Sequence, residues 1–114
     1  MRRVVVDEFI FGGDQNARVN ITGSGLLELY VTDTFALEGS SRFNPGGDQD
    51  SVMLYYGGTA PFSVAGATSF QGHVYVQTAD VDILNSGGVT GHIVTGGTSV
   101  DITGNAAAHV RVIY

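Results

Sequence analysis

Apolar and polar residues alternate with a period of two in most of the apolar segments of this chain. Residues 27–31 read Leu-Glu-Leu-Tyr-Val, and residues 81–83 read Val-Asp-Ile. This alternation is the signature of strands that bury one side. The segments are short and are separated by Gly, Asn, Asp and Ser, which favour turns. The pattern predicts an all-β chain of short strands.

Similar segments recur along the chain at a nearly constant spacing. In the second half the spacing is 19 residues, so that residues 70–76 align with 89–95 and again with 108–114. Six such segments, the predicted first face, share an outward apolar position, and a turn-rich insertion at residues 44–51 accounts for the longest step between them. This predicted outer column consists of Ile10, Tyr30, Tyr55, Tyr75, Val94 and Ile113.

Five further segments alternate with those of the first face and form a predicted second face. They are residues 19–21, 35–37, 62–64, 81–83 and 100–102. Inward positions on the two faces then stack into columns of branched aliphatic side chains. These columns are Leu29, Leu54, Val74, Ile93 and Val112 on the first face, and Ile21, Leu37, Val64, Ile83 and Ile102 on the second.

A repeat of this length with two or three short strands is typical of a solenoid whose coils stack at the strand spacing of about 4.8 Å. We therefore predict a single solenoid domain over residues 1–114. It would be a single-stranded parallel β-helix of about five coils, right-handed because a six-residue rhythm is absent. The alternative is an antiparallel sandwich, which also has many short strands, but its side chains do not normally repeat at a fixed offset.

Composition narrows the functional classes. A net charge of −6 argues against binding to a nucleic-acid backbone, and the absence of Cys excludes disulfides and thiolate metal sites. No apolar run approaches the ~20 residues of a membrane-spanning helix. The apolar run at residues 4–6 stops at Asp7 and Glu8, too soon for a signal peptide. A cytoplasmic protein and a surface module without its leader both fit.

Several of these segments resemble a known family. Residues 29–31, 35–41, 44–48 and 54–56, with the later coil at 72–83, resemble a β-helical domain of bacterial surface proteins that follows a PilX-like, prepilin-type N-terminus. The resemblance covers about residues 18–114 and implies an extracellular or pilus-associated β-helix without catalytic residues. The short, Gly-punctuated coils are also similar to those of bactofilins, which implies a cytoplasmic filament subunit.

Two features predict interactions with other chains. A contiguous apolar patch marks an interaction site, so we expect the predicted outer column to dock another copy, a covering helix or a partner. The alternative is a ladder of side chains that only stabilises the sheet. An open end of a β-helix presents unpaired backbone groups, so we also expect head-to-tail stacking, unless local loops protect the ends.

Two groups of side chains are weak candidates for metal ligation. His73 and His92 occupy the same position on adjacent coils, but a zinc site needs three or four protein ligands. In the 19-residue alignment Arg111 comes next, and His109 lies two positions out of register. A solvent-facing polar column is therefore the favoured interpretation.

Carboxylates supply the other candidates. Asp48 and Asp50 could bind Ca²⁺ through their oxygens, although turn formation alone explains Asp there. Asp82 and Asp101 stack on the second face, where a solvated, mildly repulsive pair is expected in place of an acid–base pair.

The sequence as a whole predicts a non-enzymatic structural or adhesive module without a cofactor. It would belong to a bacterial surface or pilus-like assembly and associate with itself through its coil ends and its apolar outer column. A cytoskeletal, bactofilin-like filament subunit is one alternative. A carbohydrate-binding β-helix is the other, for which only the insertion at residues 44–51 is long enough to help build a groove.

Overall fold

The computed structural model describes residues 2–11, 18–19, 26–45, 47–66, 68–84, 88–97, 99–102 and 107–112. These residues form strands and one short 3₁₀ helix, η1 (Gln49–Ser51). The strands are β1 (Arg2–Phe11), β2 (Arg18–Val19), β3 (Leu27–Leu37), β4 (Arg42–Phe43), β5 (Val52–Tyr56), β6 (Phe62–Val64), β7 (Ser69–Gln71), β8 (His73–Val76), β9 (Val81–Ile83), β10 (Gly88–Thr95), β11 (Val100–Ile102) and β12 (Ala107–Val112).

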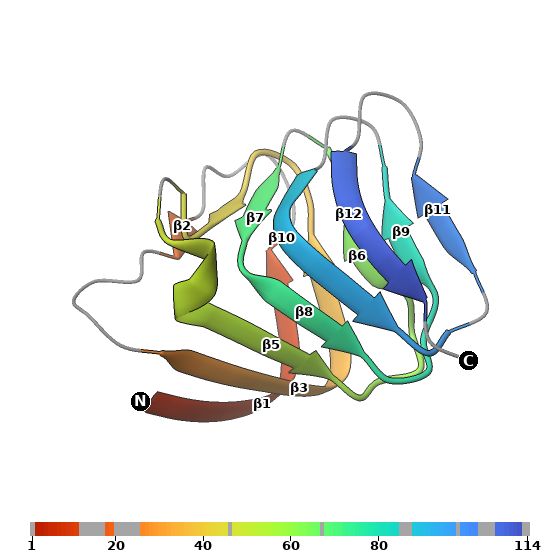
Figure 1. The fold of residues 1–114 in the computed structure, drawn as a ribbon, viewed down its shortest axis with the longest axis horizontal. Coiled ribbons are helices and arrows are strands. Elements are labelled where there is room, and N and C mark those ends of the chain that lie inside the picture. The colour runs from red at the N-terminus through yellow and green to blue at the C-terminus, as the bar shows by residue number, and fades with distance from the viewer. Residues whose placement is uncertain are drawn as a thin grey trace.

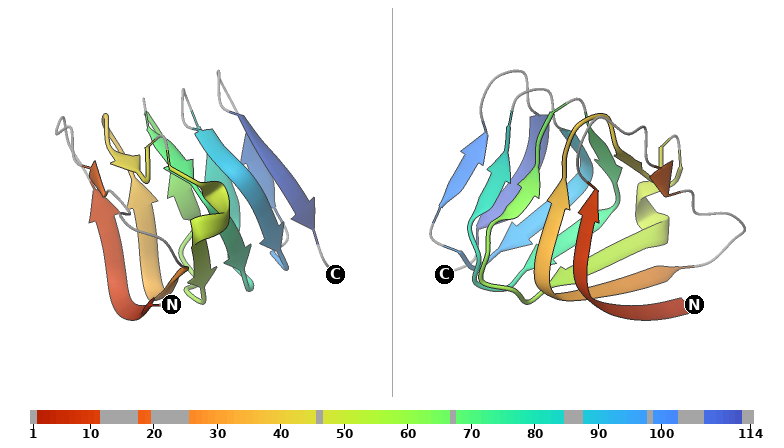
Figure 2. Two further views of the ribbon diagram at one scale, coloured as in Figure 1. Left: turned by 60° about the vertical axis from the view of Figure 1, so that its left-hand side comes forward. Right: turned by 180° about the vertical axis from the view of Figure 1, so that it is seen from behind.

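Every strand pairing in the described parts of the chain is parallel. The prediction of an all-β fold with parallel strands is therefore confirmed. Successive strands of each face lie side by side in one direction (Figures 1 and 2). The resulting sheet is open, and its arrangement agrees with the predicted β-solenoid.

Three groups of strands form the faces of the domain. The first face contains β5, β8, the N-terminal halves of β1 and β3, and the C-terminal halves of β10 and β12. The second face contains β6, β9, β11 and the C-terminal halves of β1 and β3. A third face, which the sequence did not separate from the others, contains β2, β4, β7 and the starts of β10 and β12.

The core lies between these faces, and its predicted aliphatic columns are largely confirmed. Leu29, Leu54, Val74 and Ile93 are buried on neighbouring strands of the first face, and Leu37, Val64 and Ile83 are buried on the second. Ile21 lies outside the described residues.

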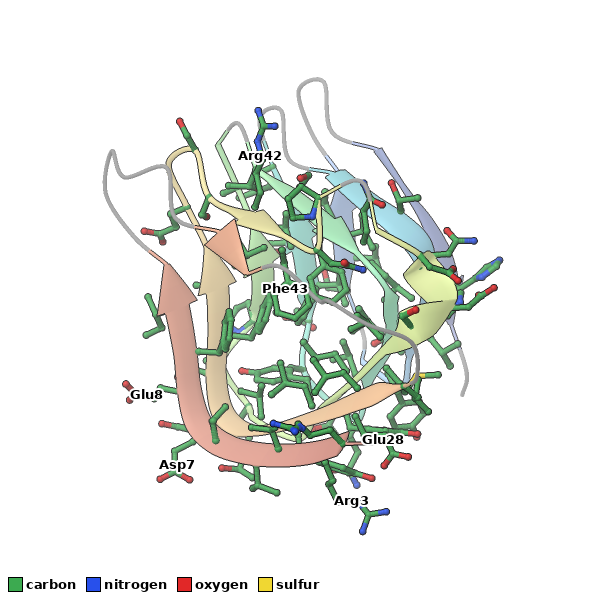
Figure 3. All side chains as sticks on the ribbon, turned by 90° about the vertical axis from the view of Figure 1, so that its left-hand side faces the viewer. Arg3, Asp7, Glu8, Glu28, Arg42 and Phe43 are labelled. Atoms are coloured by element: carbon green, nitrogen blue, oxygen red, sulfur yellow. The ribbon has the colours of Figure 1, made fainter. Side chains whose placement is uncertain are left out.

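Stacked aromatic rings also fill the core. The rings of Phe35 and Phe62 stack with centroids 4.6 Å apart, and those of Phe43 and Phe70 with centroids 4.7 Å apart. Phe43 points into the interior between the faces (Figure 3). Aromatic stacking contributes about 0.5–1.5 kcal/mol per pair beyond the buried area. Like side chains are therefore stacked in the core as well as on the surface.

The prediction of Ile10 as the first residue of the outer column is wrong. Val5, not Ile10, lies opposite Tyr30, whereas Ile10 lies opposite Ala36 on the second face. The reason is that β1 is one long strand that continues around the corner between the two faces, with a register shift between Val6 and Glu8. Alternation indicates which side of a strand a residue occupies, but not which face the strand has reached.

The predicted register of the last strand is also wrong. Val94 pairs with Arg111, an offset of 17 residues, because β12 has two residues fewer at its corner than β10. Val110 therefore takes the predicted place of Val112 beside Ile93, and His109 lies beside His92. Ile113 lies outside the described residues.

Candidate functional site

Apolar and aromatic residues lie in line on the outside of the first face. Five of them occupy consecutive rungs and are named here the tyrosine column: Val5, Tyr30, Tyr55, Tyr75 and Val94. Val5 is 64% exposed and Tyr75 is 42% exposed, while the other three are half-buried. The structure thus brings together four of the six predicted positions, with Val5 added.

The N-terminal part of this column is held in a fixed arrangement. The rings of Tyr30 and Tyr55 stack with centroids 4.8 Å apart and an interplanar angle of 14°. The Tyr30 hydroxyl donates to Glu28 Oε2 at 3.0 Å, and Arg3 Nε donates to the same oxygen at 3.3 Å. Arg3 and Glu28 project from the outside of the first face (Figure 3). The hydrogen bond to Glu28, followed by desolvation, raises the pKa of Tyr30.

An open hollow of about 310 Å³ lies beside the column. Its lining is uncharged and half of its residues are tyrosines; it consists of Tyr30, Val31, Thr32, Tyr55, Tyr56, Gly57, Tyr75 and Gln77. Val31 and Tyr56 are buried in the core. Because strand side chains alternate between the two sides of a sheet, Val31 and Tyr56 supply the floor of the hollow, and the three tyrosines of the column, Tyr30, Tyr55 and Tyr75, supply a wall.

Gly57 keeps the hollow open. It lies between Thr32 and Gln77 in the outward column that runs beside the tyrosine column. The backbone hydrogen bonds set this register, because Gly57 N donates to Val31 O and Gln77 N donates to Tyr56 O. A Cβ atom built on Gly57 would meet only Gln77 Oε1, at 3.7 Å, which is an ordinary contact. The backbone therefore tolerates a side chain here, and it is the absence of one that leaves the space.

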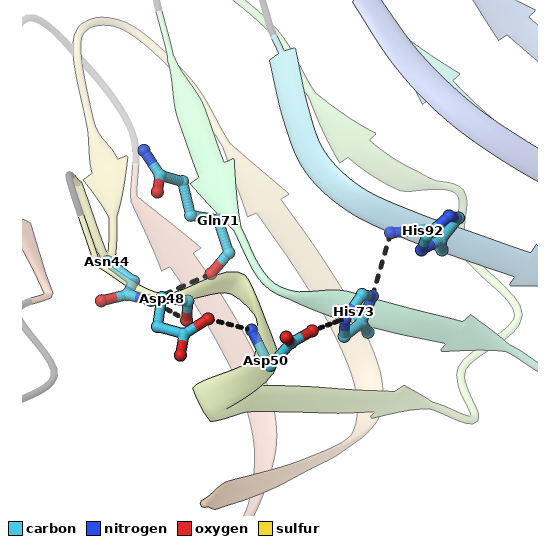
Figure 4. A network of polar contacts seen from close by, with 6 residues as sticks. All are labelled: Asn44, Asp48, Asp50, Gln71, His73 and His92. Carbon is cyan, nitrogen blue, oxygen red and sulfur yellow. Dashed lines mark hydrogen bonds and ion pairs between the residues drawn. The ribbon is translucent and has the colours of Figure 1, made fainter. Parts of the chain in front are cut away.

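The two histidines predicted to share a register are in contact, and they are linked to the insertion. Their rings stack with centroids 5.3 Å apart, and His73 Nδ1 accepts from the backbone N–H of His92 at 3.1 Å. The neutral His73 ring therefore carries its proton on Nε2, which lies 2.7 Å from Asp50 Oδ1. Both ring nitrogens of His73 are thus engaged (Figure 4).

The insertion itself is held by local hydrogen bonds. Asp48 Oδ1 accepts from the backbone N–H of Asp50 and caps η1, and Asn44 Nδ2 donates to the carbonyl oxygens of Asp48 and Gln71. Figure 4 shows these contacts running from the insertion to His73. In the part of the chain that the structure describes, no group of three or more His, Asp or Glu side chains is arranged to hold a metal ion. The geometry assigns Asp48, Asp50 and His73 a structural role.

A column of different chemistry lies on the outside of the second face. Asp82 lies between Ser63 and Asp101 on neighbouring rungs, as the spacing predicted. Desolvation, the Asp101 carboxylate and the Asp80 carboxylate, in that order, raise the pKa of Asp82. Like charges directly opposite each other destabilise a sheet, so this column opposes folding slightly.

Comparison with known proteins places the chain in a family without assigning an activity. No curated protein and no solved structure matches the chain. Within the described residues, no helix is long and apolar enough to cross a membrane. A family described as a domain of unknown function, DUF7305, matches residues 3–111. The chain therefore belongs to the DUF7305 family.

Proposed function

We propose that this domain is a non-enzymatic structural module whose copies stack end to end. Each copy would be one β-solenoid of about five right-handed coils of ~19 residues. The strand β1 of one copy would pair with β12 and β11 of the next, so that the parallel pairing continues from copy to copy. Such a contact is heterologous and forms an open fibre rather than a closed dimer.

The open edge of β1 is the observation that carries this proposal. Among the described strands, β1 pairs with β3 alone, although it is ten residues long. An edge strand of that length is a template for pairing with another chain. Val4 and Val6 are only partly buried at this edge. They would continue the columns that reach Val110 and Val112 at the other end.

The distribution of charge also favours contact through the ends. Residues 1–25 carry three Arg and three acidic residues, and residues 96–114 carry one of each. Residues 26–95 carry one Arg and seven acidic residues, which accounts for the net charge of −6. Copies of this chain would therefore repel each other through their sides, whereas their end coils have no net charge.

The tyrosine column by itself is a poor surface for self-association. Five rungs at the strand spacing give a length of about 19 Å, and the column is one side chain wide. Its area is on the order of 200 Å², against roughly 800 Å² per partner in a standard interface. We therefore assign self-association to the coil ends and not to the outer column.

The setting of the assembly is a proposal from sequence resemblance. The resemblance to the β-helical domain of PilX-like surface proteins favours an extracellular or pilus-associated assembly. The resemblance to bactofilins favours a cytoplasmic filament instead. End-to-end stacking is common to both settings.

Substitution of Val5 by proline tests the proposal. Arg2 N donates to Leu26 O, and successive N–H groups of a strand point to opposite sides. The N–H of Val5 therefore points to the open edge, where proline removes a donor without breaking a bond to β3. Val5→Thr is the matched control because it keeps the N–H.

Light scattering coupled to size exclusion, with negative-stain microscopy, measures the outcome. We expect the wild type and Val5→Thr to grow in mass with concentration. Val5→Pro should need roughly tenfold more protein to do so, which corresponds to about 1.4 kcal/mol per contact. A wild-type protein that stays at 11.9 kDa throughout, or a Val5→Pro variant that assembles like Val5→Thr, contradicts the proposal.

A further inference from the structure

We propose that the hollow beside the tyrosine column binds a short, neutral oligosaccharide. This inference is independent of end-to-end stacking, because the hollow lies on the outside of the first face and uses neither coil end. It rests on the size of the hollow, on its lack of charge, and on the kinds of polar group at its rim.

The size of the hollow fits a small ligand. A volume of about 310 Å³ lies at the lower end of the range for ligand sites, about 300–1,000 Å³. The wall runs over the three rungs of Tyr30, Tyr55 and Tyr75, which corresponds to about 10 Å along the stack. The hollow is thus an elongated trough that accepts a short chain of units lying along the column.

The lining excludes charged ligands. None of the residues that line the hollow is charged. Two carboxylates lie beside the lining and both already accept hydrogen bonds: Glu28 accepts from Arg3 and Tyr30, and Asp7 accepts from Thr32. An anionic ligand would find no cation in the lining, and a cationic ligand would find no carboxylate there.

The polar groups at the rim both donate and accept hydrogen bonds. Gln77 carries an exposed amide with two donors and an acceptor. The hydroxyl of Tyr30 is engaged by Glu28, so Tyr55 and Tyr75 supply the phenolic hydroxyls that face a ligand. Across the trough, the Thr32 hydroxyl is oriented by a 2.9 Å hydrogen bond to Asp7 Oδ1.

A sugar chain matches this combination of groups. Its ring C–H groups pack against the aromatic ring of Tyr75, which is 42% exposed, and its hydroxyls are neutral donors and acceptors that suit an amide and phenols. A purely apolar ligand would form no hydrogen bond with the Gln77 amide at the rim and would gain nothing from that group. A proline-rich peptide also docks on aromatic grooves, but its prolines lack the backbone N–H, so it offers fewer donors to the acceptor oxygen of Gln77 than a sugar chain with a hydroxyl on most of its ring carbons.

The test fills the hollow without disturbing the fold. Gly57→Leu places a side chain in the trough, and the space around Gly57 admits its Cβ atom. Gly96→Leu is the matched control. Gly96 lies one rung beyond Gln77, because its N–H donates to Val76 O, and it does not line the hollow. Tyr75→Ser, at an exposed position, removes part of the wall. It replaces Gly57→Leu in the test if that variant does not fold.

Binding is first surveyed on a glycan array and then measured by calorimetry with neutral cello-, chito-, malto- and manno-oligosaccharides. We expect a defined preference in the wild type, roughly tenfold weaker binding in Gly57→Leu or Tyr75→Ser, and unchanged binding in Gly96→Leu. The Val5→Pro variant, which assembles less readily and is changed at a position outside the lining of the hollow, should bind as well as the wild type, which separates this proposal from the assembly.

Three outcomes overturn the proposal. The first is the absence of binding to every neutral glycan. The second is equal binding by Gly57→Leu and the wild type, which would place the sugar elsewhere. The third is binding of a proline-rich peptide that Gly57→Leu abolishes while no glycan binds, which would identify the ligand as a protein segment.

Discussion

The outer columns of the first and second faces are built on the same stacked backbone but carry opposite chemistry. On the first face, Tyr30 stacks on Tyr55 with centroids 4.8 Å apart. On the second face, Asp82 lies directly beside Asp101, and the neighbouring charge helps to raise the pKa of Asp82. Parallel stacking in register places like residues side by side, so it adds an attraction on one face and a repulsion on the other. The identity of each column, and not the fold, decides whether a face is a binding surface.

A carboxylate introduced into the tyrosine column should give the largest effect. Tyr55→Asp removes the stacking on Tyr30, worth about 0.5–1.5 kcal/mol, and replaces a good strand former by a poor one, at up to ~1 kcal/mol. We expect the free energy of unfolding to fall by about 2 kcal/mol in urea denaturation. Tyr55→Phe is the control and should stay near the wild type. A loss of stability in Tyr55→Phe as large as in Tyr55→Asp would show that stacking is not the cause.

Substitution of the neighbouring residue, Tyr56, compares the inside of the first face with its outside. Tyr56 is buried, and its hydroxyl lies 2.8 Å from Asp33 O and 2.6 Å from Ala60 O. Tyr56→Phe should cost about 1 kcal/mol because it removes the hydrogen bond that the Tyr56 hydroxyl donates to a backbone carbonyl, whereas Tyr55→Phe removes an outward hydroxyl at little cost.

Alkaline pH provides a second measurement on the same pair of variants. Desolvation, followed by the nearby Asp33 charge, raises the pKa of Tyr56 above its usual 10.0. The folded protein thus holds this proton more tightly than the unfolded chain, so stability falls as the pH rises above that value. Tyr56→Phe should lose less stability over this range than the wild type. Parallel pH curves for the two proteins would contradict this.

Neutralisation of the acidic column should give the smallest effect, and one of opposite sign. Asp82→Asn should raise the free energy of unfolding at neutral pH by a few tenths of a kcal/mol, because it removes one like-charge contact. Asp82 has a raised pKa in the folded state. Its protonated form therefore favours folding, and wild-type stability falls as the pH rises from 3.8 through the folded pKa.

The same variant removes that part of the pH dependence. Urea denaturation of the wild type and Asp82→Asn at acidic and neutral pH measures both effects. The two proteins should converge in stability at the acidic end, where Asp82 is protonated. A variant that is less stable than the wild type at neutral pH would show that the carboxylate contributes a favourable contact.

The sequence predicted the parallel stack because one kind of residue recurs at each inward position. Leu29, Leu54, Val74 and Ile93 follow the strand spacing and are found together in the core. The prediction failed where the spacing changes. The corner within β1 lies at Asp7 and Glu8, where the alternation is interrupted, but two adjacent polar residues do not show that the strand passes onto another face. The shortened corner of β12 leaves no mark, because β12 keeps apolar residues at every second position.

The hollow and the link to the insertion could not be predicted in the same way. The predicted register of Tyr30, Tyr55 and Tyr75 already places Gly57 between Thr32 and Gln77, but the sequence pattern does not show that the missing side chain at Gly57 leaves a hollow. The contact between Asp50 and His73 joins a loop to a strand 23 residues away. The stacking of the two histidines could be predicted, because the sequence places them in the same register. Nothing in the spacing indicated that the insertion folds back onto them.

The parallel pairing of all described strands gives the molecule a direction. The edge of β1 and the edge formed by β11 and β12 are chemically different, so a stack of copies would be polar. Its two ends would gain and lose subunits at different rates. Two copies that meet through their β1 edges would have to pair antiparallel, which leaves no free β1 edge between them. Such a pair would stop growth at that end, so the length of a fibre would reflect how often subunits meet in the wrong orientation.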